Sequence, residues 1–232
     1  MKGLFVAGTG TDVGKTHITG LLLRALRARG VDAGSLKPVQ TGCAPGEPPL
    51  DLAAHWQLAG WHPADAVARD CAPFVFVDPV SPHLAARREG VTLDVAGVAA
   101  AVRRAAHHFS FSLVEGAGGV LVPLNERETL LDLMRALELS VLLVAEAGVG
   151  TINHTLLTLA ALRGAGVPVL GVVLNARGPV AEAGVAEDNA ATIAAMGGCP
   201  VFGIVDAGAG LDGSEPDAVA AALAALAEND LS

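Results

Sequence analysis

The stretch GTGTDVGKTH, residues 8–17, determines how the rest of the chain is interpreted. It follows the apolar run LFVAG at 4–8, which is typical of a buried strand, and leads into a segment of helical period that begins near Lys15. A strand, a glycine-bearing turn and a helix in this order bring backbone N–H groups and a helix N-terminus together. Such an arrangement binds anions, so the stretch predicts a phosphate-binding loop.

The loop departs from the commonest phosphate-loop pattern, G-x-x-x-x-G-K-[ST]. That pattern requires glycine at position 9, where this chain has Thr9, and the first glycine, Gly8, lies one residue earlier. The ending Gly-Lys-Thr is retained, so Lys15 is expected to reach the β- and γ-phosphates of a nucleotide and Thr16 to ligate Mg²⁺. The alternative is an ordinary tight turn that happens to contain glycines. The Gly-Lys-Thr ending at the start of a helix argues against this alternative.

The composition favours one α/β domain over residues 1–232 and argues against several kinds of partner. The chain is 52% hydrophobic but only 3% aromatic and has no tyrosine, so its core is expected to be aliphatic. It therefore offers no aromatic platform for nucleic-acid bases. The net charge of −9 also argues against nucleic acid or an anionic membrane as a partner.

The sequence favours a cytoplasmic location. It contains no apolar run long enough to span a membrane, and it begins directly with a strand rather than a signal peptide. Cys43, Cys71 and Cys199 are isolated from one another, which is typical of reduced thiols rather than of a disulfide framework or a zinc site.

Short apolar runs alternate with longer segments of helical period along the whole chain. The apolar runs are continuous rather than alternating, as expected for strands covered by helices on both faces. This order predicts a doubly wound, mainly parallel sheet flanked by helices, in a single domain. Strands are predicted at 4–8, within 32–39 but stopping before Pro38, and at 74–76, 111–119, 140–146, 168–176 and 199–205. Helices are predicted at 16–29, from Asp51, at 94–108 and 150–164, and from Asp217.

Charged residues stand near the ends of two predicted strands, at the edge where α/β sheets bind ligands. Lys37 follows the second strand, and Glu115 ends an apolar strand. Asp51 is expected to be the N-cap of a helix. Because Mg²⁺ takes one or two carboxylates together with phosphate oxygens, Glu115 and Asp51 are candidate metal ligands. The alternatives are a solvated lysine for Lys37, a capping or solvated Glu115, and capping alone for Asp51.

The stretch GTINHT at 150–155 begins a predicted helix after another buried strand. The free N–H groups of Gly150, Thr151, Ile152 and Asn153 at this helix start are expected to form a site for a carboxylate. For Asn153 the alternative is a capping role.

Five blocks in this sequence resemble those of the dethiobiotin synthetase family, whose phosphate loop reads G-T-D-T-x-V-G-K-[TS]. Besides the loop they are KPVQTG (37–42), SPHLAA (81–86), VEGAGG (114–119) and GTINHTLLT (150–158). They occur in the family's order and at similar spacing, over roughly residues 3 to 205. The resemblance implies a P-loop NTPase-like fold and a cyclo-ligase of biotin biosynthesis.

The implied reaction joins 7,8-diaminopelargonic acid and CO₂ at the expense of ATP. One amine becomes a carbamate, which attacks the γ-phosphate to give a carbamic–phosphoric anhydride. The second amine then closes the ring and expels phosphate. The resemblance also implies Mg²⁺ as cofactor and a homodimer, in which the helix start at Gly150 comes from the other subunit and binds the carboxylate tail of the substrate.

The resemblance assigns roles to residues of these blocks. The catalytic cations are Lys37 and Lys15, and the metal ligands are Thr16, Asp51 and Glu115. The nucleotide-binding residues are Asp12, Val13, Gly14, Lys15, Thr16, His17, Glu115, Gly116, Ala117, Gly118 and Asn175, with Asn175 expected to contact adenine. The substrate-binding residues are Thr11, Lys37, Thr41, Gly118, Gly150, Thr151 and Asn153.

Three places differ from the family pattern. Gly10 replaces a common aspartate, a change that a turn tolerates because glycine fits any turn. Glu146 stands where many relatives carry a basic residue, and is expected to weaken carboxylate binding or alter the dimer contact. The stretch GIVDAG (203–208) lacks a proline that often frames the base, which leaves the preference for ATP over other triphosphates open.

Two other functions occur on the same fold. A partner-binding ATPase switch of the partitioning or division-site type usually carries a second lysine where this chain has Gly10, and often ends in a basic membrane-binding helix. This chain ends in the acidic segment EPDAVAAALAALAENDLS (215–232), which disfavours that reading. The synthetase-like domain of a cobalamin-pathway amidotransferase is disfavoured because the sequence has no glutaminase portion.

Overall fold

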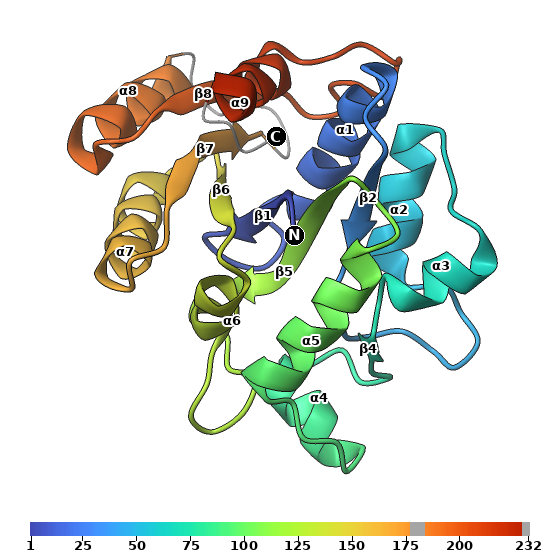
Figure 1. The fold of residues 1–232 in the computed structure, drawn as a ribbon. Coiled ribbons are helices and arrows are strands. Elements are labelled where there is room, and N and C mark those ends of the chain that lie inside the picture. Colours follow the sequence, from blue (N-terminus) through green and yellow to red (C-terminus); the bar gives the residue numbers. More distant parts are fainter. Residues whose placement is uncertain (177–183, 229–232) are drawn as a thin grey trace.

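Six parallel strands form the central sheet of the computed structural model, which describes residues 1–176 and 184–228 (Figure 1). The strand order is β2-β5-β1-β6-β7-β8, and every registered neighbour pair within this sheet is parallel. The strands are β1 Gly3–Gly8, β2 Ala33–Leu36, β5 Phe111–Gly119, β6 Ser140–Glu146, β7 Val169–Asn175 and β8 Val201–Val205. The predicted doubly wound, mainly parallel sheet is thus confirmed.

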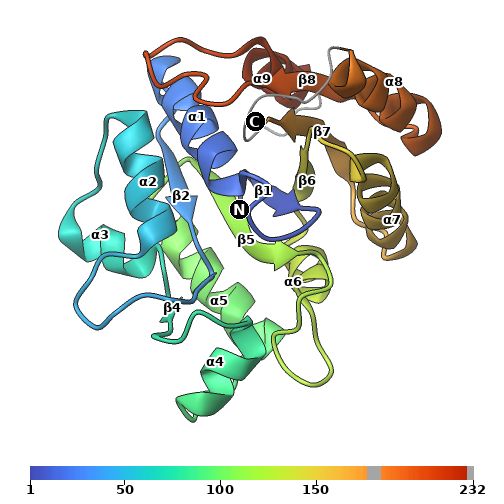
Figure 2. The same cartoon turned by 180° about the vertical axis from the view of Figure 1, so that it is seen from behind.

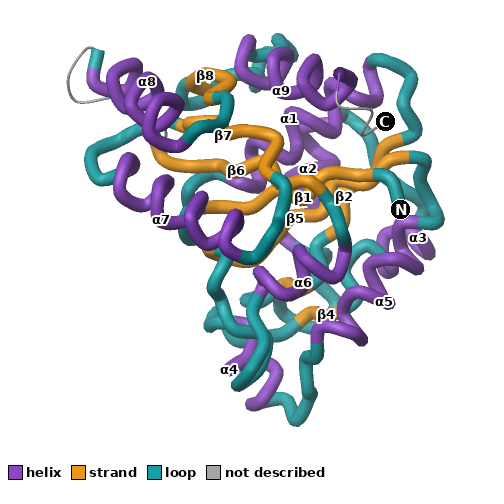
Figure 3. The backbone as a smooth tube through the Cα atoms, turned by 60° about the vertical axis from the view of Figure 1, so that its left-hand side comes forward, coloured by secondary structure: helices purple, strands orange, loops and turns teal. Residues whose placement is uncertain are grey.

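Helices cover both faces of this sheet. The described helices are α1 Lys15–Ala28, α2 Leu50–Ala59, α3 Asp65–Asp70, α4 Pro82–Arg88, α5 Val95–Ala106, α6 Leu130–Leu137, α7 Thr151–Gly164, α8 Val185–Gly197 and α9 Asp217–Glu228. Helices α1 and α9 pack on one face, with α2 against α1, while α5, α6 and α7 pack on the other; Figure 3 shows the sheet between the two layers. None of the described helices has the length and apolarity needed to span a bilayer.

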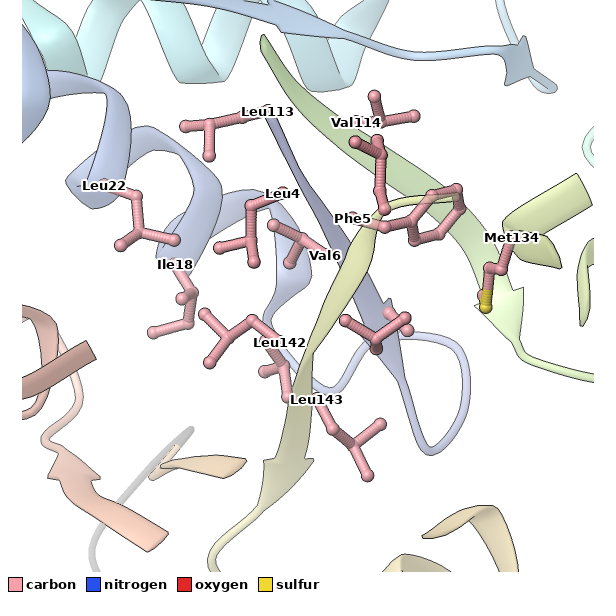
Figure 4. Close-up of a cluster of buried hydrophobic side chains, with 14 of the residues drawn as sticks. Leu4, Phe5, Val6, Ile18, Leu22, Leu113, Val114, Met134, Leu142 and Leu143 are labelled. Carbon is pink, nitrogen blue, oxygen red and sulfur yellow. The ribbon is translucent and has the colours of Figure 1, made fainter. Parts of the chain in front are cut away.

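The core is built on β1, whose residues are all buried. Because successive side chains of a strand point to opposite faces, Leu4 packs toward Ile18 and Leu22 of α1, and Phe5 lies on the side of Met134 in α6 (Figure 4). Both faces of the strand are therefore apolar, which explains why the sequence here is a continuous apolar run rather than an alternating one.

The strand predicted within 32–39 ends before Pro38, as expected. Residues 33–36 join the central sheet as β2, whereas β3 (Val39–Gln40) pairs in parallel with β4 (Phe74–Val75) in a separate two-stranded sheet. Pro38 lies between them and has no N–H to donate to a ladder, and the N–H of Lys37 already bonds the carbonyl of Cys71 at 2.8 Å. The chain therefore leaves the central sheet at Lys37.

The sequence pattern did not predict α3, α4, α6 or α8. The first three have at most eight residues, too few for a clear helical period. A local signal was present for α6, because the Asp132 carboxylate accepts from the backbone N–H of Thr129 at 2.8 Å, as in a capping box. In the acidic tail, α9 is confirmed as a helix, and residues 229–232 lie outside the described part of the chain.

Candidate active site

The phosphate loop joins β1 to α1 at the carboxyl edge of the sheet. Its last glycine, Gly14, has a left-handed backbone (φ 100°, ψ 20°) and caps α1. The N–H of Thr9 donates to the carbonyl of Val144 at 3.0 Å, which ties the start of the loop to β6. The Lys15 Nζ donates to the carbonyl of Gly10 at 2.8 Å, so the ammonium folds back over the loop. The loop is thus a concave anion site with a cation beside it.

Asn175 supports this loop from β7. Its Nδ2 donates to the carbonyl of Val13 at 3.1 Å, and its side chain is buried. A Cβ built on Gly14 would overlap the Asn175 amide, so glycine is required there by space as well as by its positive φ. The proposed contact between Asn175 and adenine stays a prediction, and the contact with the loop is an additional one that the sequence did not reveal.

A cluster of charged side chains lies next to the loop, centred on Glu115. This carboxylate is 1% exposed and lies within β5, which runs on to Gly119 rather than ending at Glu115. Its Oε1 accepts from Lys37 Nζ at 2.7 Å and from Thr16 Oγ1 at 3.1 Å. The same Lys37 Nζ lies 2.5 Å from Asp51 Oδ2. The predicted lysine and the two predicted carboxylates therefore form one contiguous network.

Asp51 does not have the capping role that the sequence predicted. Helix α2 begins at Leu50 with Pro49 as its N-cap residue, so Asp51 stands in the first turn. The capping interpretation is wrong because the helix starts two residues earlier, which turns the carboxylate toward Lys37 instead of toward the N–H groups of its own helix.

The sequence missed one member of this network, His55. Its side chain is completely buried on α2, four residues after Asp51, and its Nε2 lies 2.7 Å from Glu115 Oε2. A spacing of four places Asp51 and His55 on one face of the helix, and that spacing was the only signal available. Without the fold, nothing indicates that this face meets Glu115.

Burial and charge act against each other at the ionisable groups of the network. Burial raises the pKa of Glu115, but Lys37 and His55 outweigh it and hold that pKa well below its usual range. Burial lowers the pKa of Lys37, but Glu115 and Asp51 outweigh it and the pKa is raised. For Lys15, burial and the neighbouring Lys37 together lower the pKa to about 8, against the smaller opposing effect of Glu115. Glu115 and Lys37 are thus ionised at neutral pH, and the pKa of Lys15 lies closer to neutrality than that of an ordinary lysine.

One cavity of about 440 Å³ collects most of the predicted site residues, a size suited to a small ligand. The structure brings together the loop, both lysines and both carboxylates. Of the predicted residues, those lining the cavity are Thr11, Asp12, Gly14, Lys15, Thr16, His17, Lys37, Thr41, Asp51, Glu115, Ala117 and Gly118. Val13 and Asn175 are instead buried behind the loop. The carbonyl of Gly116 accepts a hydrogen bond from Lys37 Nζ at 3.2 Å.

The donor set fits Mg²⁺ bound with a nucleotide. Thr16 supplies a hydroxyl and Asp51 and Glu115 supply carboxylates beside the phosphate loop. Over residues 1–176 and 184–228 no three His, Cys, Asp or Glu side chains are grouped to hold a metal by themselves. Mg²⁺ in nucleotide sites takes only one or two carboxylates and completes its shell with phosphate oxygens and water, so these residues suit it.

The start of α7 is not part of this cavity. Gly150 is its N-cap with φ 92°, Thr151 is buried, and Asn153 is exposed. Helices α7 and α2 lie on different sides of the molecule in both Figure 1 and Figure 2. The structure therefore does not bring Gly150, Thr151 and Asn153 to Lys37 and Asp51 within one chain.

The segment that follows β8 is tied to α1. The ring Nε2 of His17 lies 3.0 Å from the carbonyl of Ala209, and Arg24 donates to the carbonyl of Gly210 at 2.6 Å. Arg29 forms a two-bond ion pair with Glu215 at 2.6 and 2.7 Å. These contacts hold the segment along α1, from His17 next to the phosphate loop to Arg29 at the other end of the helix.

Comparisons with known proteins identify relatives of this chain. A family model described as an AAA domain matches residues 2–215. The chain is 46% identical over 196 residues to the ATP-dependent dethiobiotin synthetase of Anaeromyxobacter dehalogenans strain 2CP-C, covering 84% of this chain and 86% of that protein. It is 40% identical over 224 residues to the synthetase of the same name from Pseudomonas aeruginosa strain LESB58, covering 96% of each.

Among solved structures, chloroplast FtsY from Physcomitrella patens superimposes with a TM-score of 0.56 at 21% identity. The match covers 95% of this chain and 64% of that one, and at this identity it shows a shared fold only.

We predict that Gly14→Ala abolishes tight nucleotide binding, because the new methyl group would displace the Asn175 amide and force an unfavourable positive φ. Gly10→Ala in the same loop is the matched control, since its Cβ would meet only Val13 Cγ1 at 3.9 Å. Calorimetric titration with ADP in Mg²⁺ is expected to show at least a tenfold weaker affinity for the first variant and near wild-type affinity for the second. Equal affinities for both variants would contradict this account of the loop.

We also predict that nucleotide binding takes up a proton at alkaline pH. In the nucleotide-free protein the Lys15 pKa is about 8, so most of this lysine is neutral at about pH 8.5. Phosphates favour the ammonium form and raise that pKa on binding. Calorimetry in buffers of different ionisation enthalpy should reveal proton uptake at about pH 8.5 and little at about pH 7. The Lys15→Arg variant, whose side chain stays charged, should take up none.

Proposed function

This chain belongs to the family of ATP-dependent dethiobiotin synthetases, and from that premise we propose that it joins 7,8-diaminopelargonic acid and CO₂ at the expense of ATP. The products are dethiobiotin, ADP and phosphate. The observation that carries the assignment to particular residues is the convergence of Lys15, Lys37 and two carboxylates in one cavity beside the phosphate loop. The relatives favour this ligase over the ATPase switch considered on the same fold.

The reaction needs cations at the point where anions meet. One amine of the substrate combines with CO₂ and loses a proton to give a carbamate. A carbamate oxygen then attacks the γ-phosphorus, and the bond to the ADP oxygen breaks. Lys15 and Lys37 both line the cavity in which this transfer takes place. Their ammonium groups stabilise the negative charge that moves during the transfer and reduce the repulsion between carbamate and triphosphate.

Ring closure completes the reaction. The second amine attacks the carbonyl carbon of the carbamic–phosphoric anhydride, the bond to the phosphate oxygen breaks, and the proton of the amine is lost to solvent or a base. We assign Thr11, Thr41 and Gly118 to the diamine because they line the cavity beside Lys37. Thr16, Asp51 and Glu115 hold Mg²⁺, which neutralises phosphate charge when bound.

We propose that the substrate carboxylate is bound by the start of α7 of a second copy of the chain. Gly150, Thr151 and Asn153 do not line the cavity of their own chain. A second hollow of about 490 Å³ adjoins the phosphate loop, lined by residues 9–11 and 119–123 and by α7. Its rim exposes Leu121 (61%) and Leu157 (63%), which is the kind of apolar surface that a subunit contact covers.

We place the protein in the cytosol, where its substrates would be made and reducing conditions prevail. All three of its cysteines are free, and Cys43 and Cys71 are buried. Buried thiols without disulfide partners suit a reducing compartment.

Dethiobiotin formation is the direct test of this function. Phosphate release from ATP, Mg²⁺ and bicarbonate is expected to require 7,8-diaminopelargonic acid and to yield a cyclic urea by mass spectrometry. Lys37→Ala should lower kcat by at least about 100-fold, because a preorganised charge is lost from the transition state. Unfolding measurements in urea check that the variant is folded, since Glu115 and Asp51 lose the ammonium group that they share. Phosphate release that ignores the diamine would overturn the function.

The composite site has its own test. Leu157→Glu is expected to dissociate the dimer in light scattering and to abolish diamine-dependent turnover, because a charge would enter the apolar contact. Met196→Glu on α8, where the side chain is 69% exposed, is the matched control and should stay dimeric and active. A fully active Leu157→Glu monomer would show that each chain completes its own site.

A further inference from the structure

His55 is a buried polar side chain to which the proposed reaction assigns no role. It is completely buried on α2, and its Nε2 lies 2.7 Å from Glu115 Oε2. An ionised carboxylate can only accept hydrogen bonds, so Nε2 carries the hydrogen. His55 does not line the cavity, whereas Glu115 does. The histidine therefore reaches the site only through this carboxylate.

The two oxygens of Glu115 have different partners. Oε1 accepts from Lys37 Nζ at 2.7 Å and from Thr16 Oγ1 at 3.1 Å, while Oε2 is bonded by His55. Because a carboxylate bonded at both oxygens has one orientation, the histidine fixes the plane of the group. Among the described residues, His55 supplies the hydrogen bond recorded at Oε2. If that bond were lost, the carboxylate would be held at Oε1 alone and could rotate.

The second ring nitrogen of His55 argues against simple packing. Nδ1 is buried and has no hydrogen-bond partner in the described part of the chain. A buried polar atom without a partner lowers stability, so an apolar residue of similar size would serve better if the position only filled space. The hydrogen bond from Nε2 to Glu115 offsets the cost of burying Nδ1 without a partner.

Helix α2 links this contact to the other carboxylate of the site. It carries Asp51, whose Oδ2 lies 2.5 Å from Lys37 Nζ, and one turn later it carries His55. One rigid element thus supplies one proposed metal ligand and the residue that orients the other. Side chains that hydrogen-bond a metal ligand from behind typically change metal affinity by about 10- to 100-fold when mutated.

We propose that His55 is a positioning residue that orients the Glu115 carboxylate to receive Mg²⁺ with the nucleotide. The inference rests on the proposed function only for the assignment of Glu115 and Asp51 to Mg²⁺. It concerns binding of the metal–nucleotide pair and not the chemistry of the diamine.

The test compares His55→Leu with His55→Gln, which keeps an N–H donor, and with the control His107→Leu at the exposed end of α5. Mg²⁺ is titrated calorimetrically into each protein with ADP and without the diamine, and the Tm of the metal-free protein is recorded. We expect His55→Leu to require about tenfold more Mg²⁺. His55→Gln is expected to recover most of this loss, and His107→Leu to behave as the wild type. If His55→Leu binds Mg²⁺ as tightly as the wild type, the proposal is overturned, whether or not the Tm of the variant is lower.

A measurement on the unaltered protein keeps the proposal testable if His55→Leu does not fold. In ¹⁵N-histidine-labelled protein, the Nε2 resonance of His55 should shift when Mg²⁺ is added to the ADP complex and not when ADP alone is added. A resonance that does not respond to Mg²⁺ would overturn the positioning role. Neither readout uses the diamine, so a wild-type protein that makes no dethiobiotin would refute the proposed function and leave this test intact.

Discussion

The buried carboxylate of Glu115 is the group on which the site depends. It lies inside an apolar sheet, where an unpaired charge would destabilise the fold by about 3–5 kcal/mol. Lys37, Thr16 and His55 surround it, and each comes from a different element: the turn after β2, α1 and α2. Satisfying one charge therefore positions three segments of the chain relative to one another. The same contacts place a lysine and the proposed metal-binding carboxylate beside the phosphate loop.

The parallel sheet makes this convergence possible. In the register of β1 and β5, Val6 lies opposite Glu115 and Gly8 opposite Gly119, so the loop that follows β1 begins close to the carboxylate. Strand β2 flanks β5 on its other side, and Lys37 comes directly after it. Since parallel strands all end at one edge, residues distant in sequence meet there without any long connection. The buried apolar side chains in the core of the sheet supply the folding free energy that this polar edge does not.

The phosphate loop shows the same reliance on distant segments. Its last turn has the left-handed backbone of Gly14, and the adjacent Val13 carbonyl is held by Asn175, which lies 162 residues away at the end of β7. Asn175 occupies the space that a side chain at position 14 would need. Loop shape is thus set jointly by a glycine that the local sequence reveals and by an asparagine that only the sheet order brings near.

The sequence by itself determined the sheet, the phosphate loop and the chemical character of the site. Continuous apolar runs and helical periods are local patterns, and the Gly-Lys-Thr ending of the loop has a local physical meaning. Only the tertiary structure decided which side chains touch. It moved Asp51 from a helix cap to a partner of Lys37, paired Val39–Gln40 with Phe74–Val75 in a separate sheet, and brought His55 to Glu115 across 60 residues of sequence. Such contacts depend on strand order and helix docking, which are set by the packing of the whole core and not by the residues that meet.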